Sequence, residues 1–120
     1  MIRTGADRWI DDTTYRERGA GITAQACHWI LDQGVMTIGT DSVTLDMPHR
    51  IMAERSQSGD TNAWFPVHYV GREREYLIIE KLANLDKLPR HYGFLVSAFP
   101  VNIERGSGGW TRVVAIFDDA

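Results

Sequence analysis

The clearest pattern along the chain is TAQACHWILDQGVMTIG, at residues 23–39. Apolar side chains recur in it at helical spacing, at Ala26, Cys27, Ile30 and Leu31. Thr23 suits an N-cap and Gly34 suits a C-terminal stop, so we predict a helix over residues 23–33. Residues 35–39 follow at once as a short buried strand. The pattern therefore predicts a helix-to-strand unit of the kind that builds open mixed sheets.

The flanking segments are less regular. Residues 2–5 read as the end of a strand, and residues 7–21 read as a polar surface excursion with a helical turn near Tyr15. Residues 42–64 form the longest irregular region, with a short helix expected at residues 51–55. Long loops of this kind often carry function or an interface.

The second half of the chain is predicted to be mainly strands. These strands are expected at residues 76–80, 94–99 and 111–117. Pro89, Pro100 and the glycine-rich turn at residues 106–109 separate them. With the first half, this pattern predicts an α/β fold with a mixed β-sheet and few helices.

Length and composition narrow the class of protein. A chain of 120 residues favours one domain, over residues 1–120, and its longest apolar run is far shorter than the ~20 residues of a membrane span. With 13 Lys and Arg against 16 Asp and Glu, the net charge of -3 argues against nucleic acid as a partner. The single Cys27 makes no internal disulfide, and residues 1–5 lack the apolar core of a signal peptide. We therefore expect a cytoplasmic protein.

His68 and Glu80 are the pair of residues best suited to chemistry. Both are good ligands for a divalent metal ion, and a short charged connection at residues 71–75 separates their segments. If residues 66–70 and 76–80 form a hairpin, the two side chains are opposed on one face. If Pro66 instead starts a helical turn, His68 still lies over the mouth of the following strand.

The alternative is that both residues simply face solvent or make ordinary hydrogen bonds. A His and a Glu twelve positions apart occur often. Glu80 is less ordinary because it ends an apolar run, residues 77–79, in a strand that should be buried. A buried carboxylate needs a cation or several hydrogen-bond donors.

The same region resembles a known family. Residues 65–68 (FPVH) followed by residues 77–89 (LIIEKLANLDKLP) are similar to a block in the cyclase family of metal-dependent hydrolases, which contains the kynurenine formamidases. The resemblance extends to residues 23–34, to Gly39-Thr40-Asp41-Ser42, and to the last two predicted strands. It implies a swivelling β/β/α architecture, here truncated to its C-terminal portion. It also implies that His68 and Glu80 are metal ligands.

One motif of the family is missing from the sequence. Members carry an upstream His-x-Gly-Thr-His-x-Asp-x-Pro-x-His motif with further metal ligands and a catalytic histidine, and no such motif exists here. Asp46-Met47-Pro48-His49 resembles its tail, but the spacing and the order along the chain differ. We therefore interpret His49 as a loop histidine and assign no catalytic residue.

The resemblance implies hydrolysis of an amide, lactone or ester carbonyl of a small molecule by water that a zinc or manganese ion activates. His68 and Glu80 alone leave the site incomplete. Asp41 is a candidate to orient a ligand or a water, although an Asp at a strand end often caps a turn. Trp64 and Phe65 are candidates to line a substrate pocket, or else belong to the core or an interface.

Three functional hypotheses follow. The first is an arylformamidase-like hydrolase, active once another chain completes its site. The second is a non-catalytic remnant or subunit with weak metal binding. The third is a binding module that uses the substrate pocket of the family without catalysing a reaction. Uncovered strand edges would favour a homo-oligomer, a dimer or tetramer.

Overall fold

Helix α1, Ala24–Asp32, is the helix that the sequence predicts. The Thr23 hydroxyl accepts a hydrogen bond from the N–H of Ala26 at 3.1 Å and so caps the first turn. Gly34 follows the helix with φ of +82°, a left-handed conformation that glycine adopts without strain. Its N–H donates to the carbonyl of Leu31 at 3.0 Å. Local signals alone therefore account for both ends of α1.

Two short strands of the first part of the chain pair in parallel. Strand β1, Thr37–Gly39, pairs with β2, Leu77–Ile79, with Ile38 opposite Ile78. Both strands are shorter than predicted, and each lies within its predicted range. Ile2 adds a parallel bridge to Thr40, so the segment predicted as a strand end makes a single bridge there.

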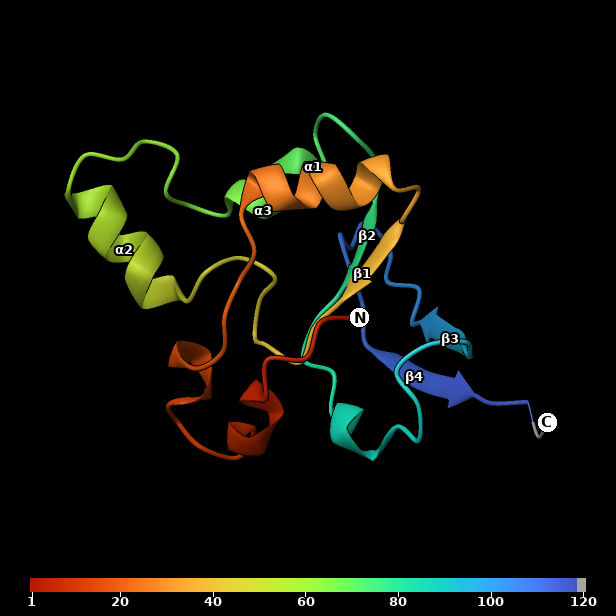
Figure 1. The fold of residues 1–120 in the computed structure, drawn as a ribbon. Coiled ribbons are helices and arrows are strands. Elements are labelled where there is room, and N and C mark those ends of the chain that lie inside the picture. The colour runs from red at the N-terminus through yellow and green to blue at the C-terminus, as the bar shows by residue number, and fades with distance from the viewer. Residues whose placement is uncertain (119–120) are drawn as a thin grey trace. The chain divides into compact units, whose positions relative to one another are not determined.

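The core of the first part of the chain lies where α1 meets another short helix, α3, and the pair of strands β1 and β2. Helix α3 spans Pro66–Val70, and Figure 1 shows it beside α1. The buried side chains of the core come from α1, α3, β1 and the loop after β1: Cys27, Leu31, Ile38, Leu45, Val67 and Val70. Since these residues come from distant parts of the sequence, the core fixes α3 against α1.

The region predicted to be irregular contains a longer helix than expected. Helix α2 spans His49–Gln57, whereas the sequence predicted a helix at residues 51–55 only. Pro48 directly precedes it, a position that needs no backbone donor, and Arg50 pairs with Glu54 one turn later. The interpretation of His49 as a loop histidine is therefore wrong, because His49 is the first residue of α2.

The last two strands form an antiparallel pair. Strand β3, Leu95–Pro100, pairs with β4, Thr111–Ile116, and the glycine-rich turn lies between them as predicted. The expected mixed sheet is thus replaced by two separate two-stranded sheets, one parallel and one antiparallel. A hairpin can satisfy its hydrogen bonds locally, without joining the parallel pair. The fold is mixed α/β, with few helices and small sheets.

This computed structural model describes residues 1–118. The chain divides into two compact units, the first spanning Met1–Leu85 and the second beginning at Asp86. The expectation of one domain over residues 1–120 stays a prediction. Within the described residues, every helix is too short or too polar to span a membrane.

Candidate functional site

The loop that follows β1 is ordered by its own side chains. The N–H of Ser42 donates to the Thr40 hydroxyl, and the N–H of Asp46 donates to the Thr44 hydroxyl, both at 3.2 Å. The carbonyl of Ser42 in turn accepts a hydrogen bond from the N–H of Lys81 at 3.0 Å. Short hydroxyl side chains of this kind satisfy backbone groups that sheet pairing leaves unpaired. The loop thereby carries Asp46 to the start of α3.

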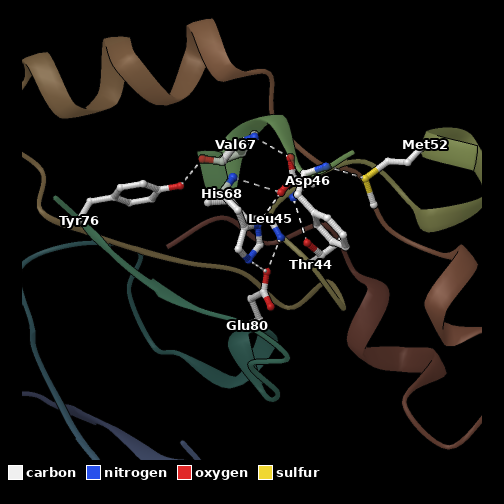
Figure 2. A network of polar contacts seen from close by, with 9 residues as sticks. Thr44, Leu45, Asp46, Met52, Val67, His68, Tyr76 and Glu80 are labelled. Atoms are coloured by element: carbon white, nitrogen blue, oxygen red, sulfur yellow. Dashed lines mark hydrogen bonds and ion pairs between the residues drawn. The ribbon is translucent and has the colours of Figure 1, made fainter. Parts of the chain in front are cut away.

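Asp46 is the buried centre of the candidate site. Its carboxylate, with a side chain 0% exposed, accepts hydrogen bonds from the N–H of Val67 at 2.6 Å and from the N–H of His68 at 3.4 Å. Its Oδ2 also lies 2.5 Å from Nδ1 of His68 (Figure 2). The two N–H groups belong to the first turn of α3, where helices lack internal acceptors. Asp46 therefore holds both the start of α3 and the ring of His68.

Glu80 approaches the other nitrogen of the same ring. It follows β2 directly, and its Oε1 lies 3.7 Å from Nε2 of His68. The N–H of Leu45 donates to the same Oε1 at 2.8 Å, which fixes the carboxylate (Figure 2). The side chains of His68 and Glu80 are 39% and 21% exposed, so both border solvent. The structure thus brings together the two residues that the sequence singled out.

Of the two arrangements considered for this pair, the structure has the helical turn. Pro66 is the first residue of α3, where its missing N–H costs nothing. The hydroxyl of Tyr76 donates to the carbonyl of Val67 at 2.6 Å and ties the turn to the start of the next strand. The alternative of a hairpin between residues 66–70 and 76–80 is wrong, because the first of these segments is helical.

The surroundings of His68 favour its protonated form. The hydrogen bond to Asp46 raises the pKa of the imidazole above its usual value, burial opposes this, and the charge of Glu80 raises it further. Carboxylates therefore face both ring nitrogens. A divalent cation would meet the same favourable charge as a proton.

The ring of Phe65 lies next to the histidine. The Phe65 ring lies edge-on to the rings of His68 and His49, with centroids 5.6 Å apart in both cases. The Trp64 ring lies 6.1 Å from that of Phe65. Of the two predicted pocket residues, Phe65 thus contacts the site, and Trp64 lies one ring further away.

Asp41, the remaining candidate for the site, has its hydrogen-bond partners elsewhere. Its buried carboxylate accepts hydrogen bonds from the N–H and hydroxyl of Thr4, at 2.7 and 2.8 Å, and from the N–H of Gly5, at 2.6 Å. Burial alone would raise the pKa of Asp41, but these bonds outweigh it and lower the pKa. The carboxylate therefore holds the N-terminal segment against the loop after β1.

The donor atoms of His68 and Glu80 suit a shared metal ion. Two ligands at zinc–nitrogen and zinc–oxygen distances in a tetrahedron are about 3.4 Å apart, close to the observed 3.7 Å. Asp46 occupies the opposite nitrogen of the ring and cannot reach the same ion. Among residues 1–118, no group of three or more His, Cys, Asp or Glu side chains is placed to hold a metal ion. His68 and Glu80 are thus the two candidate ligands at this place.

Asp46 is the residue that the sequence reasoning missed. In the sequence, Asp46 and His49 only resemble the tail of a family motif. Its link to His68 spans 22 positions, and no helical or strand period connects the two residues. The available signal was chemical, since a histidine that binds metal commonly donates its other N–H to a carboxylate.

Comparison with known proteins shows which family the chain resembles. Residues 1–47 match the family model described as "Putative cyclase", and these residues include the ordered loop and Asp46. Together with a curated relative, this match supports a cyclase-family identity for the chain. The relative is isatin hydrolase of Roseibium aggregatum, which is 30% identical over 100 residues. The aligned part is 83% of this chain and 35% of that protein, and no solved structure matches the chain.

Proposed function

We propose that His68 and Glu80 are two ligands of a divalent zinc or manganese ion in a hydrolase that acts on an amide, lactone or ester carbonyl. The observation that carries this proposal is the 3.7 Å separation of Nε2 of His68 from Oε1 of Glu80, at the surface of a buried network. The relative named isatin hydrolase supports the reaction class. We propose an aryl formamide or a similar small molecule as the substrate class.

When bound, such an ion polarises a carbonyl and lowers the pKa of a coordinated water. The protein's own groups fix the geometry. The N–H of Leu45 holds the Glu80 carboxylate, and the ring of Phe65 lies edge-on to that of His68. Ligands held in this way need little rearrangement when the ion arrives.

Two protein ligands are fewer than the three that catalytic zinc sites usually have. We therefore propose that the isolated chain binds metal weakly, and that a second copy or another chain completes the site. A dimer or tetramer would meet this need. The competing proposal is a non-catalytic subunit that keeps the pair His68 and Glu80, since a pair of ligands is fewer than a catalytic zinc site usually has.

The first experiment measures binding of Mn²⁺ and Zn²⁺ to the chain by isothermal titration calorimetry. His68→Ala and Glu80→Gln should each weaken binding by about tenfold or more, because each removes one of two ligands. Binding that neither substitution changes would overturn the assignment.

A second pair of residues in this chain gives a matched control. Nε2 of His28 lies 3.7 Å from Oε2 of Glu73, the same separation, but the side chains are 37% and 72% exposed. His28→Ala and Glu73→Gln should leave metal binding unchanged. An equal loss in both pairs would mean that any surface His–Glu contact binds the ion.

Activity separates the two proposed functions. Hydrolysis of an aryl formamide and of a lactone is measured with the metal-loaded chain, both unsubstituted and carrying His68→Ala. Turnover that disappears with His68→Ala supports the hydrolase. Metal binding without any turnover, in the monomer and in any dimer or tetramer that forms, supports the subunit.

A further inference from the structure

We infer that Asp46 is a positioning residue: it keeps the proton of neutral His68 on Nδ1 and so presents the bare Nε2 to Glu80 and to a cation between them. The part about the cation rests on the proposed function. The part about the proton rests only on the contacts of Asp46, and it can be tested without any metal.

The proton assignment follows from the chemistry of the acceptor. An ionised carboxylate accepts hydrogen bonds and donates none. Oδ2 of Asp46 lies 2.5 Å from Nδ1 of His68, so Nδ1 must be the donor. In a neutral imidazole only one nitrogen carries hydrogen, and Nε2 is then left with a free lone pair. This is the form of histidine that binds metal ions.

Asp46 cannot turn away from the ring. Its Oδ1 accepts the N–H of Val67 at 2.6 Å, and its own N–H donates to the hydroxyl of Thr44 at 3.2 Å. The side chain is 0% exposed, so water does not compete for these bonds. The orientation of the ring is therefore fixed from the buried side, and Nε2 points toward Glu80 (Figure 2).

The direct test is the nitrogen-15 spectrum of His68 in the metal-free chain, at an alkaline pH where the imidazole is neutral. We expect the hydrogen on Nδ1. A spectrum with the hydrogen mainly on Nε2 would overturn the inference.

Asp46→Asn tests the cause. If the amide oxygen keeps the short bond to the N–H of Val67, the amide NH₂ group faces Nδ1 of His68. The hydrogen should then move to Nε2, and affinity for Mn²⁺ should fall about 10- to 100-fold, as for other residues that hold metal-binding histidines. A tautomer and an affinity that both stay as in the unsubstituted chain would contradict a positioning role.

Asp41→Asn is the matched control. Asp41 is as buried as Asp46 and its carboxylate also accepts three hydrogen bonds, but these come from Thr4 and Gly5. The substitution Asp41→Asn should destabilise the fold without changing the His68 tautomer or the metal affinity. A change of tautomer in this control would show that loss of stability, and not the contact with Asp46, moves the proton.

The spectrum of the unsubstituted chain keeps the inference testable if Asp46→Asn does not fold. It also separates the two proposals. One outcome would be a hydrogen on Nδ1 together with metal binding that is unchanged by His68→Ala. That outcome would support the positioning role of Asp46 and contradict the proposed metal site.

Discussion

Nδ1 of His68 lies 2.5 Å from Oδ2 of Asp46, a residue 22 positions earlier in the chain. This contact joins the loop after β1 to the first turn of α3. Two backbone N–H groups of that turn bond the same carboxylate. The position of the ring therefore depends on how closely the loop approaches the helix.

Gly21 lies against the backbone of the same loop, and Gly21→Ala should displace the loop. A Cβ at this position would collide with the backbone of Asp46 and Met47. Backbone atoms cannot move aside as a flexible side chain can, so we expect a loss of about 1–3 kcal/mol in the free energy of unfolding. Urea denaturation measures it. Gly108→Ala is the control, since a Cβ there meets nothing within 4 Å, and a similar loss in both variants would contradict this explanation.

Asp41→Asn should lower the free energy of unfolding by about 1–3 kcal/mol at neutral pH, because an amide NH₂ would face the donors of Thr4 or Gly5. The pKa of Asp41 is lowered below its ordinary value of 3.8. Its stabilising effect is therefore present above that value and is lost as the pH falls through the lower pKa of the folded state. The difference in the free energy of unfolding between the unsubstituted chain and Asp41→Asn should therefore decrease below about pH 3.8, as measured by urea denaturation. A difference of constant size would contradict the lowered pKa.

Phe65 has a backbone φ of +49°, a left-handed conformation that strains a side chain. Phe65→Gly and Phe65→Ala both remove the ring contact with His68, but only glycine also relieves the strain. Phe65→Gly should therefore be the more stable of the two, by about 0.5–1 kcal/mol in thermal or urea denaturation. Equal stability would show that the backbone relaxes once the ring is gone.

Cys27 should react with alkylating reagents only when the fold opens. Its side chain is 0% exposed in the core, and burial raises the pKa of the thiol. Both effects suppress the reactive thiolate, so we expect alkylation by iodoacetamide to be roughly 100-fold or more slower than in urea. Mass spectrometry follows the reaction. Rapid modification of the native chain would mean that α1 separates readily from the core.

The sequence predicts the elements whose signals are local. Thr23 and Gly34 mark both ends of α1, and the glycine-rich turn marks the β3–β4 pair. The extent of α2 could not be predicted, because its residues are mostly polar and carry a weak helical period. The separation into two sheets was also missed, since strand period does not say which strands pair.

The site shows the same division. His68 and Glu80 could be singled out from residue type and from the apolar strand before Glu80. Asp46 could not, because its role comes from a tertiary contact between a loop and a helix. The sequence places Asp41 just after a predicted strand, but only the structure shows that Thr4 and Gly5 use its carboxylate.

Helix α3 has only five residues, too few to persist in water without outside support. Asp46 and Tyr76 supply that support through bonds to Val67, and both come from other segments. In the denatured chain the imidazole of His68 and the carboxylate of Glu80 are therefore not assembled. Any ligand that needs both recognises only the native state, so its whole binding free energy adds to the folding equilibrium.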